Sequence, residues 1–353
     1  MMLCFSSDYT TGAHPRVLEA LQAINLRATA GYGMDADCRA AAECIREMCG
    51  APQAQVHFLV GGTQANLLLI AAALRPHEAA ICAETGHINV HETGAVEATG
   101  HKVLGIPAPD GKVTREGIEI VLAAHADEHM VKPALVYISN TTEVGTVYTE
   151  AEIEAIGACC RENELLLYVD GARMGSAIAA GGASLQTLAR CADAFTIGGT
   201  KNGALFGEAM VLVNPALTRD FRYIMKQRGA MLAKGWLLGA QFAALFQDNL
   251  YFDMAAHANA MAQKLARGLA AKGYEFLYPP VSNQLFPIMR DDTAQRLMKR
   301  AQFQRTQPLG DGESVWRFVT SWSTQEADVD ALIEILERFE HRQSQYLIQK
   351  CRN

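Results

Sequence analysis

The alternation of strand-like and helix-like segments is the feature that most constrains this chain. Between about Gln53 and Asn214, short aliphatic runs alternate with stretches of helical periodicity such as Gln64–Leu74 and Glu150–Glu162. Several runs are continuously apolar, which is typical of strands covered on both faces. The alternation predicts an α/β fold with a mostly parallel, doubly wound seven-stranded sheet. The expected strands are Val56–Val60, Ala79–Ala83, Lys102–Ile106, Ala134–Ser139, Leu165–Asp170, Ala194–Ile197 and Ala209–Val213.

The segments outside this sheet predict three regions. Residues 1–50 form an N-terminal arm and a helix, 51–250 a large domain with its connecting helix, and 251–353 a smaller C-terminal α+β domain. The expected outer elements are a helix Ala36–Met48, a helical connector Thr218–Gln247, a helix Ala255–Lys272, strands Gln284–Met289 and Val315–Ser321, and a closing amphipathic helix Glu326–His341.

The composition excludes several classes of protein. Half of the 353 residues are apolar, yet no apolar run reaches the roughly 18–20 residues of a membrane span. The N-terminus lacks the basic flank and apolar core of a signal peptide. Nine cysteines, without a C-x-x-C pair, indicate free thiols in a reducing cytoplasm. A net charge of −7 without a basic block disfavours nucleic acid as a partner. We expect a cytoplasmic protein with neither a nucleic acid nor a membrane as partner.

A glycine pair follows the first expected strand and precedes a helix. In Gly61-Gly62-Thr63, the glycines let an anion approach the backbone, and the helix N-terminus supplies free N–H groups. The segment therefore predicts a phosphate cradle, with Thr63 as an additional donor. The alternative is a tight turn with a threonine cap. The sequence matches neither the dinucleotide fingerprint nor the P-loop.

Two further segments close expected strands. Asp170 ends the apolar run Leu165–Val169, where a carboxylate is costly unless it meets a positive partner such as a protonated pyridine nitrogen. Lys201 follows Gly198-Gly199-Thr200, and a buried lysine with a lowered pKa suits a Schiff base. The alternatives are an Asp cap for the next turn and a solvated loop lysine.

Ligands of parallel sheets gather at the carboxyl ends of strands, so these three segments predict one site. Together they indicate pyridoxal 5′-phosphate (PLP), with Lys201 as the Schiff-base lysine and Asp170 at the ring nitrogen.

From about Phe5 to Val213, and again near Arg317, the chain resembles the low-specificity L-threonine aldolases of the β-eliminating lyase group, which are fold-type-I PLP enzymes. The matching pieces are Ser6-Ser7-Asp8-Tyr9-Thr10, Gly31-Tyr32-Gly33-Met34-Asp35, Gly62-Thr63-Gln64-Ala65-Asn66, His87 with Glu92-Thr93-Gly94-Ala95, Ser139-Asn140-Thr141 and Asp170-Gly171-Ala172-Arg173. The last of these is highly specific.

The resemblance implies a role for each matching residue. Gly62 and Thr63 would hold the phosphate, and His87 would stack on the pyridine ring. His129 matches a family histidine placed near the substrate hydroxyl. Ser7, Arg173 and Arg317 would bind the substrate carboxylate. The resemblance also implies a homodimer or homotetramer with active sites at the subunit interface.

The chain departs from the family pattern in three places. Thr200 replaces the usual serine before the lysine. The segment Arg228–Ala233 replaces a glycine-rich one that reaches toward a neighbouring subunit's phosphate, so a phosphate contact by Lys226 or Arg228 is one interpretation. After Arg317, the usual histidine is lost, and Trp316 and Trp322 can reshape the pocket.

Several histidines and arginines have a plainer explanation. His87 and His91 are spaced like two metal ligands on a helix, but no H-E-x-x-H glutamate accompanies them, so we expect no metal site. His129 lies in a polar stretch and can be a surface residue. Arg173 can form a salt bridge to Asp170 or Glu92 instead of binding a substrate.

Three hypotheses for the function follow. The first is aldol cleavage of a β-hydroxy-α-amino acid of the L-threonine or L-allo-threonine type to glycine and an aldehyde, with His129, His87 or a water held by either as the base. The second keeps PLP but eliminates a β-substituent from another amino acid. The third is a binding or regulatory protein that keeps the fold without catalysis.

Overall fold

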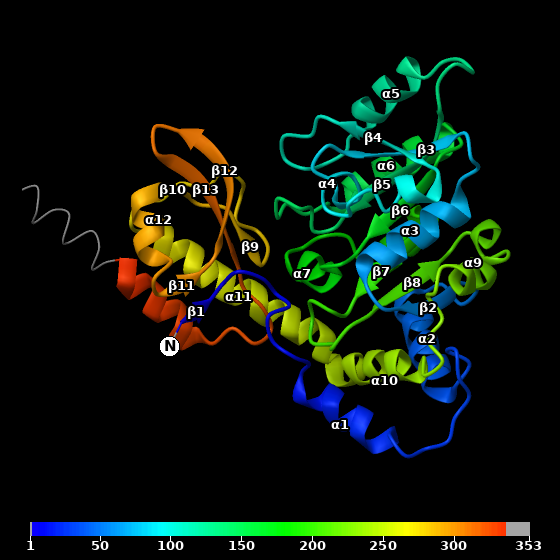
Figure 1. Ribbon diagram of the computed structural model, residues 1–353, viewed down its shortest axis with the longest axis horizontal. Coiled ribbons are helices and arrows are strands. Elements are labelled where there is room, and N and C mark those ends of the chain that lie inside the picture. Colours follow the sequence, from blue (N-terminus) through cyan, green and yellow to red (C-terminus); the bar gives the residue numbers. More distant parts are fainter. Residues whose placement is uncertain (1, 337–353) are drawn as a thin grey trace, which may run out of the picture.

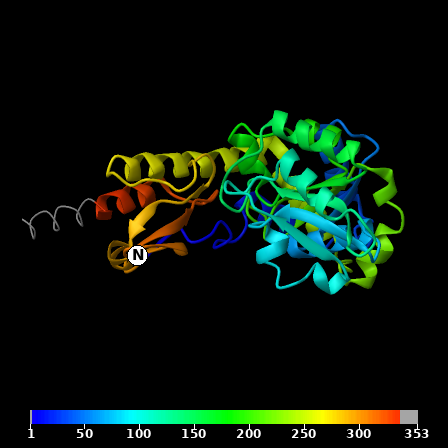
Figure 2. The same cartoon turned by 90° about the horizontal axis from the view of Figure 1, so that it is seen from above.

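The computed structural model describes residues 2–336, which form a large sheet-containing unit and a smaller C-terminal unit (Figure 1). Helix α11 (Leu250–Ala270) runs from the edge of the large unit along the small one. The view from above shows the two units side by side, with the N-terminal arm passing between them (Figure 2).

The large unit is built on the seven-stranded sheet that the sequence predicts. Its spatial order is β2-β8-β7-β6-β5-β3-β4, and every neighbouring pair is parallel except the two that involve β8. The strands are β2 (Gln55–Leu59), β3 (Glu78–Ala83), β4 (Lys102–Ile106), β5 (Lys132–Ser139), β6 (Leu166–Asp170), β7 (Ala194–Gly198) and β8 (Glu208–Leu212).

Successive residues of these strands enter two different cores, because side chains alternate across a sheet. Ile81 and Val136 contribute to the first core, beneath α2, α5, α6, α8 and α10. Ala80 and Leu135 contribute to the second, beneath α3 and α9. The covering helices are α1 (Pro15–Ile24), α2 (Ala36–Cys49), α3 (Gly62–Ala73), α5 (Arg115–Ala124), α6 (Glu150–Glu162), α8 (Leu185–Cys191), α9 (Phe221–Gln227) and α10 (Trp236–Leu245).

The expected helical connector at 218–247 is broken in the structure. Helix α9 ends at Gln227, Gly229 adopts φ +69°, and α10 begins only at Trp236. Glycine reaches this left-handed conformation without a steric penalty, so it provides the stop. The prediction of one continuous connecting helix is therefore wrong.

The small unit packs a short antiparallel sheet against α11. Strand β13 (Glu313–Val319) pairs with β9 (Gln284–Leu285), β10 (Ile288–Arg290) and β12 (Gln304–Gly310), and β1 (Leu3–Cys4) of the arm pairs with β11 (Ala301–Gln302). Helix α12 (Asp291–Leu297) lies between β10 and β11. Residues 326–336 are helical, as expected; residues 337–341 of the expected closing helix lie outside the described residues.

The prediction of one strand over Gln284–Met289 and the omission of β12 are errors with a physical cause. Two residues separate β9 from β10, and β12 is exposed along all seven of its residues, so it lacks the alternation that marks a strand. None of the helices between residues 2 and 336 is long and apolar enough to cross a membrane.

Candidate active site

A cavity of about 580 Å³ lies at the carboxyl edge of the large sheet, where β2, β5, β6 and β7 end. We call it the Lys201 cavity. Its wall also includes the start of α4 (His87–Val90), the start of β8 and residues of the small unit. The lining residues are Tyr9, Val60, Gly61, Gly62, Thr63, His87, His91, Ser139, Thr141, Glu143, Asp170, Ala172, Arg173, Thr200, Lys201, Phe206, Glu208, Gln284, Gln304 and Arg317.

The glycine pair forms the N-terminus of α3 at one side of this cavity. Gly61 is the N-cap residue and makes no side-chain cap bond, so Thr63 does not cap the helix. A Cβ added at Gly61 or Gly62 would meet no atom within 4 Å. The free N–H groups of the first turn therefore border open space, as a helix N-terminus that receives an anion requires.

Asp170 lies at the floor of the cavity and is fixed by three donors. Tyr137 Oη and Asn66 Nδ2 donate to its Oδ2 at 2.7 and 3.0 Å, and the Ala172 N–H donates to Oδ1 at 2.9 Å. Burial favours the neutral carboxyl, but the charge of His87 and these hydrogen bonds outweigh it and hold the pKa of Asp170 below its ordinary value. The carboxylate is thus kept charged and oriented. It also caps the following turn through Ala172, so the two interpretations of Asp170 are compatible.

Lys201 lies beside Asp170, on the loop that follows β7. Burial and the positive charge of Arg173 lower the pKa of its ammonium group, which favours the neutral, nucleophilic amine. Glu208, at the start of β8, faces it, and burial raises the pKa of this carboxyl to about 8. The Oε2 atom of Glu208 has no hydrogen-bond partner among the described residues.

His87 lines the same cavity from the start of α4. Its Nδ1 lies 2.8 Å from Glu92 Oε1, and Asn66 Nδ2 donates to the same oxygen at 2.7 Å. Burial lowers the pKa of His87, but the hydrogen bond to Glu92 and the charge of Asp170 raise it above its ordinary value overall. Asn66 thus links the Asp170 and His87 ends of the site.

Arg173 is held by Asp8 rather than by Asp170 or Glu92. Its Nε and NH2 atoms donate to the two Asp8 oxygens at 2.6 and 3.1 Å. Burial favours the neutral carboxyl of Asp8, but Arg173 and Lys201 keep its pKa below the ordinary value. Ser7, the preceding residue, is buried, and its Oγ accepts from the Tyr9 N–H at 3.4 Å. Ser7 does not line the cavity, whereas Tyr9 does.

Arg317 reaches the cavity from β13 of the small unit. Its NH2 group donates to Gln304 on the paired strand β12, while its buried Nε has no partner among the described residues. Burial and the nearby Arg173 lower its pKa. Two guanidinium groups from different units therefore face one cavity, which suits an anionic group such as a carboxylate.

Four polar residues of the wall were not singled out from the sequence: Glu143, Glu208, Gln284 and Gln304. Glu143 follows β5, and its Oε1 accepts a hydrogen bond of 2.8 Å from Ser139 Oγ. Gln284 is buried and its Oε1 has no partner among residues 2–336. Glu143 and Glu208 could have been found, because residues that follow β5 and β7 lie at the same edge of the sheet as Asp170. Nothing local in the sequence places Gln284, on β9 of the small unit, at this edge.

His129 lies at the opposite edge of the sheet from the Lys201 cavity of its own chain. It is exposed in the loop before β5, where its N–H bonds to Asp127 Oδ1, whereas the cavity borders the other end of that strand. Eight residues of β5 separate the two ends by roughly 25 Å. Within one chain, His129 therefore does not line the Lys201 cavity, and a role near the substrate hydroxyl stays a prediction for the assembled oligomer.

Arg228 is likewise absent from the Lys201 cavity. It is exposed at the end of α9, and the loop that follows packs against the N-terminal arm, where the Tyr32 N–H donates to the Ala233 carbonyl at 3.2 Å. Lys226 lies over the Tyr32 ring at 4.7 Å. The structure of one chain thus gives Arg228 no contact with the cofactor site.

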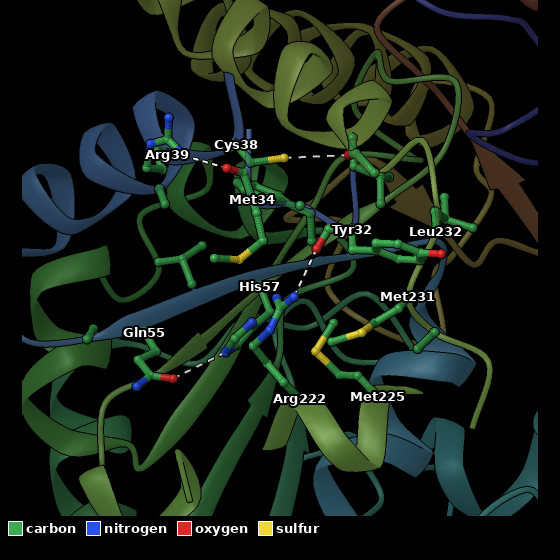
Figure 3. Close-up of a pocket in the computed structure, with 18 of the residues that line it drawn as sticks. Tyr32, Met34, Cys38, Arg39, Gln55, His57, Arg222, Met225, Met231 and Leu232 are labelled. Atoms are coloured by element: carbon green, nitrogen blue, oxygen red, sulfur yellow. Dashed lines mark hydrogen bonds between the residues drawn. The ribbon is translucent and has the colours of Figure 1, made fainter. Parts of the chain in front are cut away.

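This loop borders a second cavity of about 250 Å³, which we call the arm cavity (Figure 3). Its wall is largely apolar and contains Met34, Met225 and Met231. His57 packs on Phe221, and burial lowers its pKa to about 4, so the ring stays neutral. The Arg222 side chain donates to the Tyr32 carbonyl at 3.1 Å. The arm cavity thus lacks the opposed, perturbed charges of the Lys201 cavity.

Comparison with known proteins agrees with this geometry. Residues 5–292 match the model of the β-eliminating lyase family. The chain belongs to this family. It is 35% identical to the low-specificity L-threonine aldolase of a Pseudomonas species over 93% of this chain and 95% of that protein. It is 34% identical to the enzyme of the same name from Pseudomonas aeruginosa, over 94% and 95%.

Solved structures place this β-eliminating lyase family member in the same fold group. The threonine aldolase of Leishmania major has a TM-score of 0.94 and 47% identity, covering 96% of this chain and 99% of that one. A double mutant of Thermus thermophilus aspartate aminotransferase, at 17% identity, has a TM-score of 0.71 over 96% and 91% of the two chains. The second likeness concerns the fold alone.

Proposed function

We propose that this protein is a PLP-dependent aldolase that cleaves a β-hydroxy-α-amino acid of the L-threonine or L-allo-threonine type into glycine and an aldehyde. The observation that carries the proposal is the pairing of a deprotonation-prone Lys201 with a charged Asp170 in one cavity that also contains a free helix N-terminus. The named relatives support the choice of reaction.

The residues present fit PLP. The first turn of α3, with Gly62 and Thr63, would hold the phosphate, because its N–H groups border open space. Asp170 would pair with the ring nitrogen, Lys201 would bond to the aldehyde, and His87 would stack on the ring. When bound, PLP supplies an electron-accepting ring that takes up the electron pair of a bond broken at the substrate Cα.

The remaining residues bind and orient the substrate. Arg173 and Arg317 would grip its carboxylate, and this clamp fixes rotation about the N–Cα bond. Rotation decides which Cα bond is cleaved, because only a bond perpendicular to the ring plane delivers its electrons to the ring. Asp8 holds the Arg173 guanidinium in place through two hydrogen bonds. Ser7 and Arg228 have no such contact in one chain and stay predictions.

The direct test is a panel of amino acids with purified, PLP-loaded enzyme. We expect glycine and the matching aldehyde from threonine, allo-threonine or phenylserine. If none of these yields glycine while serine or cysteine yields pyruvate and ammonia, the alternative β-elimination is the function. If a Lys201→Ala variant retains the full biological output, the protein acts as a binding module instead.

We further propose a homodimer or homotetramer in the cytoplasm. Exposed apolar side chains on the arm and α9, including Leu26, Met34 and Tyr223, support a subunit interface. The eight cysteines within the described residues are free thiols, which suits a reducing compartment. Light scattering of the holoenzyme tests the assembly.

A further inference from the structure

Because His129 lies away from the Lys201 cavity of its own chain, we looked among the residues lining that cavity for a group that can take the proton from the substrate's β-hydroxyl. Such a group must line the Lys201 cavity and be uncommitted to another task. The other titratable residues of the wall are Tyr9, His87, His91, Glu143, Asp170, Arg173, Lys201, Glu208 and Arg317. Asp170 and Lys201 serve the cofactor, and the two arginines stay protonated, which leaves His87, His91, Tyr9 and two glutamates.

The geometry points to Glu143 as the base that accepts the β-hydroxyl proton. This inference rests on the proposed function and names the residue that performs one step of it. Cleavage transfers the hydroxyl proton to the Glu143 carboxylate, and the O–H electron pair forms the aldehyde C=O bond. The Cα–Cβ bond breaks, and its electron pair stays on Cα until a proton returns there. Threonine thereby becomes glycine and acetaldehyde, with atoms and electrons balanced.

Glu143 lines the cavity close to Asp170 and Arg173. It follows β5, the strand next to β6, so it lies beside Asp170 and across from Lys201, which follows β7 on the other side of β6. Glu143 also lies close to Arg173. Burial lowers the pKa of the Arg173 guanidinium, and the negative charges of Asp8 and Glu143 raise it above its ordinary value. A substrate held by Arg173 through its carboxylate would therefore present its side chain near Glu143.

The Glu143 carboxylate is oriented and still available. Ser139 Oγ donates to its Oε1 at 2.8 Å, its own backbone N–H also stabilises the carboxylate, and the side chain lines the cavity. Burial and the charge of Asp170 raise the pKa of Glu143, which makes its carboxylate a stronger base than an exposed one. The ionisable groups that face it are Cys82, His87, Tyr137, Tyr148, Asp170 and Arg173.

The competing groups are less suitable. His87 is bound to Glu92, and its raised pKa favours the imidazolium form, which has no lone pair to accept a proton. Glu208 faces Lys201 on the opposite side of Asp170. Tyr9 is 56% exposed on the arm. His91, at the end of α4, is the main rival. Its side chain is largely exposed, but the partial burial of the ring and the charge of His87 lower its pKa, which favours the neutral imidazole that can accept a proton.

The test compares two reactions of the same holoenzyme: cleavage of threonine, and exchange of the glycine α-proton with D2O, followed by NMR. Exchange requires Lys201 and Asp170 but no β-hydroxyl base. We expect Glu143→Gln to lower kcat/KM for cleavage by about 100-fold or more while glycine exchange stays within about threefold of the wild type. Glycine exchange also reports that the variant is folded and loaded.

Two matched variants complete the test. Glu208→Gln changes the carboxyl on the Lys201 side, so the ratio of cleavage to exchange should stay as in the wild type. His91→Asn should also leave this ratio unchanged. The inference is overturned if Glu143→Gln lowers both reactions equally or neither, or if His91→Asn separates them instead. A wild-type enzyme that exchanges glycine but cleaves no β-hydroxy amino acid would refute the proposed function, not the placement of Glu143.

Discussion

The Lys201 cavity and the arm cavity have opposite chemical character. In the Lys201 cavity, carboxylates and cations from different elements face one another, and burial shifts the pKa values of Lys201 and Glu208. In the arm cavity, methionines and a neutral His57 belong to a largely apolar wall, and the arginines that also line it have no carboxylate beside them in the lining (Figure 3). Buried charge is costly unless it has a task or a partner. The comparison indicates that the first cavity is arranged for chemistry and the second for packing.

The largest expected effect comes from Asp170→Asn. The amide preserves the shape but removes the buried charge that would hold the ring nitrogen protonated. We expect kcat/KM for threonine cleavage to fall roughly 100-fold or more. Asp193→Asn is the control, because Asp193 bonds the Leu167 N–H and Asn214 away from the cavity. The control should lose about 1–3 kcal/mol of stability and keep its kinetics. If Asp193→Asn lowered kcat/KM as much as Asp170→Asn, the loss could not be assigned to the charge of Asp170 in the cavity.

Arg173→Lys tests the carboxylate clamp. Lysine keeps the positive charge but cannot bond to both Asp8 oxygens, so it loses the fixed orientation in which Arg173 faces the cavity. We expect KM for threonine to rise about tenfold or more, with a smaller change in kcat. The same change at Arg317, which has one bonded NH2 group and a free Nε, should have the smaller effect. Unchanged KM in both variants would place the substrate carboxylate elsewhere.

Glu208→Gln tests the buried charge through the pH dependence of stability. Burial raises the pKa of Glu208 from 4.5 to about 8, so the folded state favours the protonated carboxyl. The stability this contributes is complete below about pH 4.5 and is lost as the pH rises toward about 8. Glutamine has no proton to lose. Relative to the wild type, the variant's free energy of unfolding should therefore rise between about pH 5 and 8, by at most about 1.4 kcal/mol per pH unit.

Urea unfolding of both proteins across this pH range measures the difference. Curves that run parallel would mean that Glu208 has the same pKa folded and unfolded.

The smallest kinetic effect is expected from a substitution in the arm cavity. Met225 is buried there, and Met225→Ala should cost about 2–4 kcal/mol of stability by enlarging a cavity. We expect no change in kcat/KM of the folded holoenzyme at low temperature. Thermal unfolding and steady-state kinetics measure both quantities. A large kinetic loss with an unchanged Tm would show that the arm cavity takes part in the reaction.

The fold was predictable from local pattern, but not in every part. All seven strands of the large sheet were expected, because apolar runs of strand length mark them. The sequence predicted a mostly parallel sheet but did not show that β8 runs in the opposite direction. It also did not predict β12, because all residues of this strand are exposed and show no alternation of apolar and polar side chains. The boundaries 1–50, 51–250 and 251–353 stay a prediction.

The candidate site was predictable where a residue's role follows from its place at a strand end. Gly62, Asp170 and Lys201 lie just after β2, at the end of β6 and just after β7. The spacing of His129 along the chain did not reveal that its loop lies at the other edge of the sheet from the cavity of the same chain. The Asp8–Arg173 pair joins residues 165 positions apart, and no local pattern announces such a contact.

The central claim is that Lys201 carries the cofactor. The most direct measurement is borohydride reduction of the PLP-loaded protein, followed by proteolysis and mass spectrometry. The account predicts a single reduced pyridoxyl adduct on the peptide containing Lys201, and none in the Lys201→Ala variant. An adduct on another lysine, or none in the wild-type holoenzyme, would contradict it.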